Sequence, residues 1–152
     1  MAEILVCGSV VQDLTCFTPR FARPGESVRG SKFEKFFGGK GANQAIVASK
    51  LGAKVAMVGK VGKDDFGDAA LKNFAQNQID VKFVYQTSES TTGTALITVN
   101  EENGQNSIIV IVGANEKLTE RDVLNADEIF ANAKVACCQL EVSIEATVAT
   151  LK

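Results

Sequence analysis

The segment that most constrains the fold is a glycine-rich turn followed by a helical pattern. It runs from Phe36 to Gln44 and reads Phe-Phe-Gly-Gly-Lys-Gly-Ala-Asn-Gln. Glycine adopts positive φ angles and lets a ligand approach the backbone closely. From Ala42 to Leu51, small and apolar residues recur at helical spacing, and Gly52 suits the position just past a helix end. The segment predicts extended chain, a tight turn and a helix N-terminus whose free N–H groups face the turn.

This turn fits neither of two common nucleotide-binding motifs. The Walker A pattern G-x-x-x-x-G-K-[ST] does not occur, and Gln44 stands where the dinucleotide fingerprint has its third glycine. Lys40 adds a side-chain donor, and Asn43 adds both a donor and an acceptor, a combination that suits a hydroxyl-rich or anionic ligand. The plain alternative is a structural turn in which Lys40 is solvated and Asn43 caps the helix.

Composition narrows the class of protein. The chain has 152 residues, which suits one domain with its own core, and 45% of them are hydrophobic. A net charge of −2 offers no basic field for nucleic acid or an anionic membrane, and no apolar run is long enough to span a bilayer. The early apolar stretch Ile4–Cys7 predicts a first strand and not a signal peptide. Because the chain lacks histidine, it contains no Ser-His-Asp, Cys-His or His-metal site.

The four cysteines, Cys7, Cys16, Cys137 and Cys138, form no C-x-x-C motif. We interpret them as small buried thiols in a reducing cytosol. The sequence therefore predicts a cytoplasmic protein, with the nucleus as the alternative.

Buried-type strands alternate with helices through most of the chain. A strand at Lys54–Gly59 follows the first helix, a second helix opens at Lys63–Asp65, and a shorter strand covers Val81–Tyr85. The later elements are a helix capped by Thr119, a strand within Ala133–Leu140 and a helix capped by Ser143. This order predicts an α/β fold with a mainly parallel sheet and helices on both faces. Because the last helix has no stop signal and the last strand no later partner, we expect the N-terminal half of a longer domain.

Two segments depart from this order. Leu14–Phe36 is broken by prolines and contains short alternating stretches such as Ser27–Gly30, and Gly93–Val112 has the pattern of a hairpin. The hairpin alone could be a plain edge of the main sheet, whereas the two segments together predict a small antiparallel sheet over the ligand-binding edge. Asp13 lies just past the first strand, where open α/β sheets bind ligands, although a turn or cap would also place an aspartate there.

Six short motifs occur along the chain in the order known from one enzyme family. They are Gly8-Ser9-x-x-x-Asp13, Phe37–Gln44, Val58–Asp64, Thr92–Ala95, Gly113–Asn115 and Gln139–Glu141. Together they resemble the ribokinase branch of the PfkB family of carbohydrate kinases, over essentially the whole chain. The resemblance implies transfer of the γ-phosphoryl group of ATP to O5 of D-ribose, which gives ribose 5-phosphate, with Mg²⁺ and K⁺ as further cofactors.

Carried over residue by residue, the resemblance assigns sugar binding to Asp13, Gly39, Lys40, Asn43 and Glu141. The chemistry agrees, since carboxylates accept hydrogen bonds from hydroxyls while lysine, asparagine and backbone amides donate them. The resemblance also implies that residues 14–36 and 93–112 form a lid, which closes over the sugar, excludes water and supplies the contact of a homodimer.

The chain departs from the family pattern in two ways. Val11 stands where many bacterial ribokinases have asparagine, so one sugar contact is absent or replaced. The family's Gly-Ala-Gly-Asp motif, which carries the catalytic base and an anion hole, has no match in the 152 residues. Most of the family's ATP pocket and its monovalent-cation site likewise have no match in these residues. We therefore assign no catalytic residue and expect these 152 residues to be inactive by themselves.

Two alternative functions stay open at the level of sequence. One is phosphorylation of another sugar, or of a nucleoside, by a different member of the family. The other is a non-catalytic module that binds sugar or forms a dimer.

Overall fold

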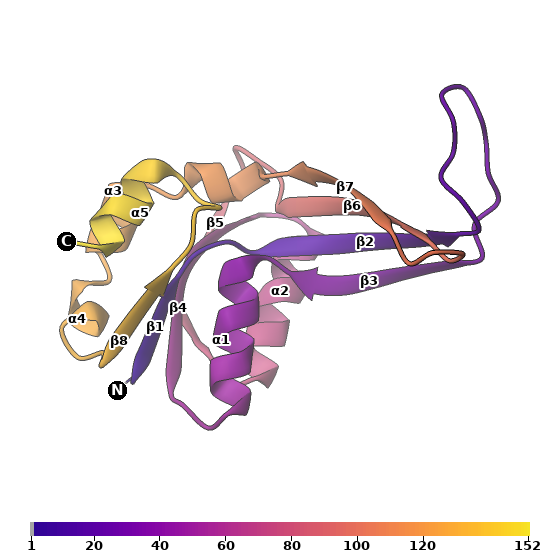
Figure 1. The fold of residues 1–152 in the computed structure, drawn as a ribbon. Coiled ribbons are helices and arrows are strands. Elements are labelled where there is room, and N and C mark those ends of the chain that lie inside the picture. Colours follow the sequence, from indigo (N-terminus) through magenta and orange to yellow (C-terminus); the bar gives the residue numbers. More distant parts are fainter. Residues whose placement is uncertain (1) are drawn as a thin grey trace.

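The computed structural model describes residues 2–152, which form two four-stranded sheets (Figure 1). The first sheet is entirely parallel, in the order β5-β4-β1-β8. Its strands are β1 (Ile4–Cys7), β4 (Val55–Gly62), β5 (Asp80–Thr87) and β8 (Val135–Cys138). The second sheet has the order β3-β2-β6-β7. Its strands are β2 (Val11–Thr18), β3 (Lys32–Gly38), β6 (Gly93–Asn100) and β7 (Asn106–Ile111).

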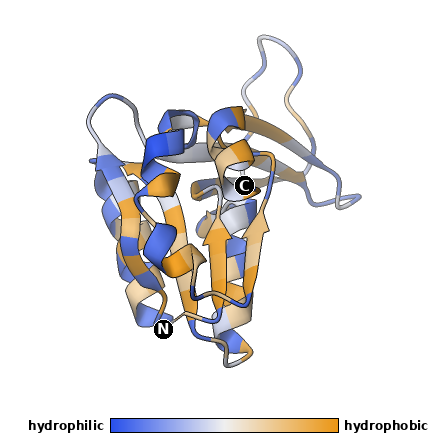
Figure 2. Cartoon of the chain, turned by 90° about the vertical axis from the view of Figure 1, so that its left-hand side faces the viewer, coloured by the Kyte–Doolittle hydropathy of each residue, from blue (hydrophilic) through white to orange (hydrophobic). Residues whose placement is uncertain are grey.

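Helices cover both faces of the first sheet. One face carries α1 (Lys40–Lys50) and α2 (Asp65–Gln76). The other carries the 3₁₀ helix η1 (Gly113–Lys117), α3 (Glu120–Leu124), α4 (Asp127–Phe130) and α5 (Ile144–Thr150). Successive side chains of a strand point to opposite faces. Val6 of β1 therefore packs toward α1 and α2, while Leu5 packs toward α3 and α5. Figure 2 shows these apolar strands enclosed between the helices. The predicted mainly parallel sheet with helices on both faces is confirmed.

The second sheet extends from the main body as an arm, and the loop between β2 and β3 projects from its far end (Figure 1). The expected separation from the first sheet is confirmed. The pairing is mixed, however: β3 and β7 run antiparallel to their neighbours, but the two central strands β2 and β6 run parallel. The reason lies in their starting points. Both strands leave the main body at adjacent positions, with Val11 opposite Gly93, and extend outward together.

Four details of the sequence interpretation need correction or gain support. Of the four cysteines interpreted as buried thiols, Cys7 is buried, Cys137 and Cys138 are half-buried and Cys16 is exposed. Asp13 does not lie in a turn, because β2 already begins at Val11 and Asp13 is paired with residues of β3 and β6. Ser27–Gly30 forms no strand; it lies in the projecting loop, where it has no partner strand. The predicted caps are confirmed, since Thr119 accepts a hydrogen bond from an amide of α3 and Ser143 does the same for α5. No helix within residues 2–152 is both long and apolar enough to cross a membrane.

Candidate functional site

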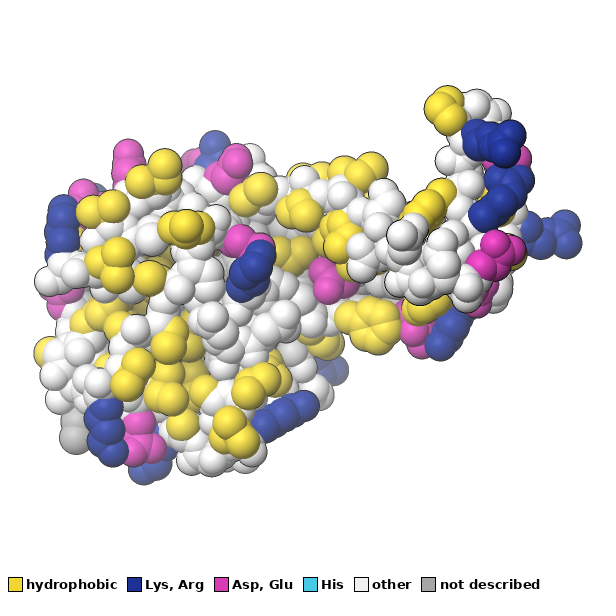
Figure 3. Space-filling model, in the orientation of Figure 1, with side chains coloured by type: hydrophobic (Ala, Val, Ile, Leu, Met, Phe, Trp, Pro, Cys, Tyr) yellow, Lys and Arg dark blue, Asp and Glu magenta, His cyan; other side chains and the backbone are white. Residues whose placement is uncertain are grey.

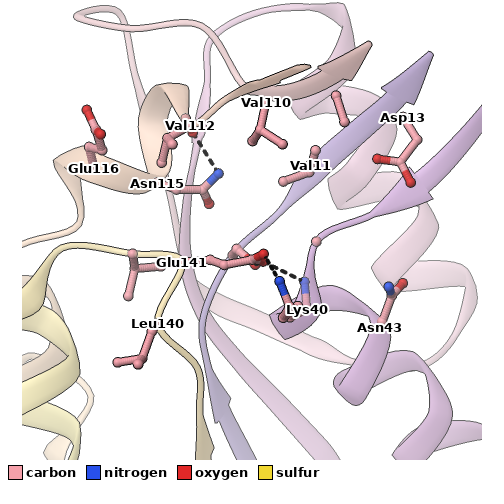
Figure 4. Close-up of a pocket in the computed structure, with 14 residues that line it drawn as sticks. Val11, Asp13, Lys40, Asn43, Val110, Val112, Asn115, Glu116, Leu140 and Glu141 are labelled. Atoms are coloured by element: carbon pink, nitrogen blue, oxygen red, sulfur yellow. Dashed lines mark hydrogen bonds and ion pairs between the residues drawn. The ribbon is translucent and has the colours of Figure 1, made fainter. Parts of the chain in front are cut away.

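A pocket of about 410 Å³ lies where the two sheets meet the N-terminus of α1. All five residues that the sequence assigns to a ligand line it: Asp13, Gly39, Lys40, Asn43 and Glu141 (Figure 4). They come from three segments that are far apart in the sequence, namely β2, the start of α1 and the turn after β8. The structure therefore brings the whole predicted set together.

The glycine turn allows the start of α1 to pack directly on the end of β1. Gly39 has a φ of 92°, and a Cβ there would lie 2.7 Å from the carbonyl oxygen of Ser9. A Cβ on Gly41 would lie 2.6 Å from the amide nitrogen of Ser9. In this arrangement the amide of Ala42 donates to the Ser9 carbonyl at 2.9 Å. Two of the three glycines are thus required by backbone contact, and the close approach places Lys40 and Asn43 at the pocket.

Glu141 is held by three donors at the floor of the pocket. Ser9 Oγ donates to Glu141 Oε2 at 2.7 Å, and the backbone amide of Lys40 donates to the same oxygen at 3.1 Å. The Lys40 ammonium pairs with Glu141 Oε1. Burial alone would raise the pKa of Glu141, but the hydrogen bonds from Lys40 and Ser9 outweigh it and hold this pKa below its usual range. Glu141 is therefore a carboxylate at neutral pH.

Asp13 faces the same pocket without a partner of its own. Its carboxylate makes no side-chain hydrogen bond to any residue from 2 to 152. Gly38 leaves room for it, because a Cβ at that position would lie 2.4 Å from Asp13 Oδ2. Burial first, and the charge of Glu141 second, raise the pKa of Asp13 above its usual range. Two carboxylates thus face one pocket, one stabilised by donors and the other free to accept hydrogen bonds from a ligand.

Asn43 lies on the exposed side of α1, and Figure 4 shows its side chain at the pocket edge below Asp13. Across residues 2–152, the side-chain amide of Asn43 has no hydrogen-bond partner. Asn43 therefore does not cap the helix, as the plain alternative supposed. The N-cap of α1 is Gly39, which has no side chain to contribute. Asn43 therefore keeps both a donor and an acceptor for a ligand.

Two polar residues of the site belong to the sequence motifs but were given no role of their own from the sequence. Ser9 supports Glu141, and its position directly after Gly8 at a strand end was the available signal. Asn115 is 1% exposed and bridges three backbone groups: it accepts from Val10 N at 2.8 Å and donates to the carbonyls of Val10 and Val112 at 2.9 and 2.8 Å. Its side chain fastens the two points at which the chain passes between the sheets.

The second sheet also lines the pocket with apolar side chains beside Asp13. These are Val11, Ala95 and Val110 from its strands and Val112 just after β7, and Leu140 adds apolar surface from the turn after β8. A small ligand that presents both hydroxyl and C–H groups matches this mixed lining. Asp13 and Glu141 would accept hydrogen bonds, and Lys40 and Asn43 would donate them.

The chain is similar to proteins of one enzyme family. The profile of the pfkB family carbohydrate kinases matches residues 1–150. A ribokinase of Mus musculus is 46% identical over 150 residues, which are 99% of this chain and 46% of that protein. A deoxyribokinase of Salmonella typhi is 38% identical over 143 residues, which cover 94% of this chain and 46% of that protein.

The fold is also that of solved members. The structure of Arabidopsis thaliana ribokinase complexed with ribose and ATP superposes with a TM-score of 0.82 at 28% identity, and covers 98% of this chain and 50% of that one. The chain thus spans about half the length of the curated relatives it matches.

Proposed function

The chain belongs to the pfkB family of carbohydrate kinases, and we propose that the protein containing it transfers the γ-phosphoryl group of ATP to O5 of D-ribose. The product is ribose 5-phosphate. The observation that carries this proposal is the convergence of Asp13, Lys40, Asn43 and Glu141 on one pocket. The 46% identity to a ribokinase over nearly the whole chain supports ribose as the acceptor.

In this proposal the residues of the chain bind and orient the sugar. The Asp13 carboxylate and one edge of the Glu141 carboxylate accept hydrogen bonds from ring hydroxyls, while Asn43 and the Gly39 amide donate. Such charge-assisted hydrogen bonds within a partly buried pocket fix which hydroxyl points toward the nucleotide. In the transfer, the bond between the γ-phosphorus and its bridging oxygen breaks, a bond from O5 to phosphorus forms, and O5 loses its proton. We assign the acceptor of that proton to no residue of this chain.

ATP, Mg²⁺ and K⁺ belong to the proposal as the cofactors of the complete protein. ATP use is supported by the Arabidopsis thaliana ribokinase structure, which is a complex with ribose and ATP. Within residues 2–152, no group of three or more Cys, Asp or Glu side chains lies close enough together to hold a metal ion. We therefore assign neither metal ion to side chains of this chain. The chain has no recognised nucleotide-binding motif to which ATP could be assigned, and we keep the expectation that the 152 residues alone transfer no phosphoryl group.

The second sheet is proposed to act as the lid. It overhangs the pocket with Val11, Ala95 and Val110, and its closure over a bound sugar would remove water, the competing acceptor for phosphate. We further propose that the lid forms the contact of a homodimer, and that the protein acts in the cytoplasm. The exposed apolar side chains of this sheet support the dimer (Figure 3).

One residue favours a second candidate substrate. Val11 presents an apolar surface at the pocket, at a position where many ribokinases have asparagine, so one hydroxyl partner is missing. A sugar with one hydroxyl fewer, such as 2-deoxyribose, would leave no group unpaired there. The 38% identity to a deoxyribokinase agrees with this candidate.

The test is phosphoryl transfer by the full-length protein, supplied with Mg-ATP and K⁺ and with a panel of pentoses, hexoses and nucleosides. We expect the highest kcat/KM with ribose and formation of ribose 5-phosphate. A higher kcat/KM with 2-deoxyribose would favour the second candidate. Absence of transfer to every acceptor, together with measurable sugar binding, would instead identify a non-catalytic module.

A further inference from the structure

A buried glutamine joins the end of β8 to helix α1. Gln139 is 8% exposed, and its Nε2 donates to Oε1 of Gln44 at 2.6 Å. Gln44 lies on the first turns of α1, on the exposed side of the helix. This is a side-chain contact between two segments that are 95 positions apart in the sequence.

The glycine at the end of β1 makes room for this contact. A Cβ on Gly8 would lie 1.8 Å from Oε1 of Gln139 and 2.7 Å from its Cδ. The same Oε1 is buried and accepts no hydrogen bond within residues 2–152. An unpaired buried carbonyl is unfavourable for folding, so an apolar side chain would serve stability better at this position. The amide is therefore better explained by what it holds in place.

What it holds is the turn that carries Glu141. Gln139 precedes Glu141 by two residues, and Gln44 follows Lys40 by four. The Lys40–Glu141 ion pair is itself exposed, with 67% and 34% of the two side chains accessible. Such a pair contributes little to fixing a turn, because solvent screens it and two flexible side chains must be ordered. The hydrogen bonds from Ser9 Oγ and the Lys40 amide hold the carboxylate at the end of the Glu141 side chain, and not the backbone of the turn. Leu140, between Gln139 and Glu141, is 89% exposed and anchors nothing.

We propose that Gln44 and Gln139 are positioning residues, which form an amide latch that keeps Glu141 against Lys40 and Ser9 in the geometry that binds the sugar. This inference rests on the proposed sugar-kinase function. The hydrogen bond has a direction that a variant can test, because Gln139 is the donor and Gln44 the acceptor.

The test compares apolar variants of similar size in the full-length protein. Gln44→Met and Gln139→Met are each expected to raise the KM for ribose about three- to tenfold, the effect of losing one hydrogen bond. The KM for ATP should not change, and kcat should change less than the KM for ribose. The double variant should be no worse than the worse single variant, because one contact is lost in all three. Gln44→Glu keeps the acceptor oxygen, so its KM for ribose should lie closer to the wild-type value than that of Gln44→Met.

Gln76→Met is the matched control, since Gln76 is exposed at the end of α2, outside the pocket. The latch is refuted if both variants match this control, or if their effects on KM multiply in the double variant. Should Gln139→Met fail to fold, the exposed Gln44 still carries the test.

Backbone order parameters from ¹⁵N relaxation separate the latch from the proposed function. The order parameters of residues 140–142 should be lower in the two variants than in Gln76→Met, and equal values would overturn the latch whatever the substrate. A wild-type protein that phosphorylates no sugar would refute the proposed function, and the order parameters would still decide the latch.

Discussion

Asp13 and Glu141 are two carboxyls of one pocket with opposite pKa shifts. Donors surround Glu141 and lower its pKa, whereas burial and the charge of Glu141 raise the pKa of Asp13. An unpaired carboxylate is unfavourable in the free protein and becomes favourable when hydroxyl groups reach it. Asp13 is thus the residue at which the proposed sugar binding and the stability of the free protein make opposite demands.

Replacing Asp13 by alanine should weaken sugar binding strongly. Loss of a charged hydrogen-bond partner costs about 1.5–3 kcal/mol, or about a ten- to hundredfold rise in the KM for ribose. Asn43→Ala should act in the same direction by a smaller factor, because its amide is neutral. Asp127→Ala, at an exposed position on α4, is the control. Steady-state kinetics of the full-length protein decide this prediction, and unchanged KM values in both pocket variants would contradict the site.

Asp13→Asn should stabilise the folded protein at neutral pH. Because the pKa of Asp13 is raised on folding, the folded state binds a proton that the unfolded state has released, so stability falls as the pH rises through this range. Asparagine does not ionise, so the variant does not lose this part of its folding stability as the pH rises. The melting temperature of the variant should exceed that of the wild type at about pH 7, and the difference should shrink toward about pH 4. A variant that melts below the wild type at both pH values would show that the Asp13 charge stabilises the fold.

At the residue scale, motifs and chemistry selected five residues that line one pocket, but they gave no role to the residues that support them. Asp13 and Glu141 carry charges and follow the strands β1 and β8 within a few residues, although Asp13 itself lies inside β2. Ser9 and Asn115 act through contacts with segments far away in the sequence, at Glu141 and at the backbone of Val10. Such partners depend on how the chain closes on itself, which one stretch of sequence does not contain.

At the scale of elements, the glycine turn shows why the helix start was predictable. Gly39 and Gly41 are required by the backbone of the neighbouring strand end, and the helix that follows has an ordinary small-residue face. Strand boundaries were less accurate: β2 begins three residues earlier than the expected segment, because pairing with both β3 and β6 extends it to Val11. The short loop sequence 27–30 has strand-like alternation, but no neighbouring strand satisfies its backbone groups.

Two glycines with nearly equal φ angles differ in crowding, and the ψ of 133° at Gly39 adds backbone strain of its own because it lies outside the left-handed helical region. Gly39 has a φ of 92° and Gly52 a φ of 93°, but only Gly39 has backbone atoms within contact distance of an added Cβ. Gly52→Ala should cost about 1–2 kcal/mol through conformation alone. Gly39→Ala should cost clearly more and also raise the KM for ribose, since α1 must move away from Ser9. Urea denaturation and sugar kinetics of both variants test this prediction, which fails if the two are equally destabilised.

At the scale of the whole molecule, the main body and the arm differ in how they bury apolar residues. The first sheet is covered by helices on both faces, whereas the arm exposes apolar side chains on both of its faces. These are Phe33, Phe36, Phe37, Leu96, Ile108, Ile109, Val110 and Ile111. The order of strands and helices predicted the main body because its periodicity is regular. The parallel pairing of β2 with β6 depends on where two distant strands leave that body, and local pattern contains no information about it.

If the arm forms the proposed dimer, a charge on it should separate the subunits. Ile109 is 64% exposed on β7, and Ile109→Glu in the full-length protein should shift sedimentation from dimer to monomer. Ile108→Glu tests the opposite face of the same strand. Leu51→Glu, at the equally apolar but distant end of α1, should have no effect. A monomeric wild-type protein, or dimers that persist in both β7 variants, would exclude this interface.

If the arm closes over the sugar as proposed, Asn115 marks the point beside the pocket about which it would rotate. Asn115 clamps the backbone at Val10 and Val112, where the arm begins. β2 is 8 residues long, which at about 3.3 Å per residue gives an arm of about 26 Å. A rotation of about 10° at this point would therefore move the tip by about 4.5 Å, while the pocket walls move far less. A fluorescent label in the loop beyond β2 would then move several ångströms when the pocket is filled and so report its occupancy. In a dimer joined through the arms, rotation of one arm would move the arm of the other copy.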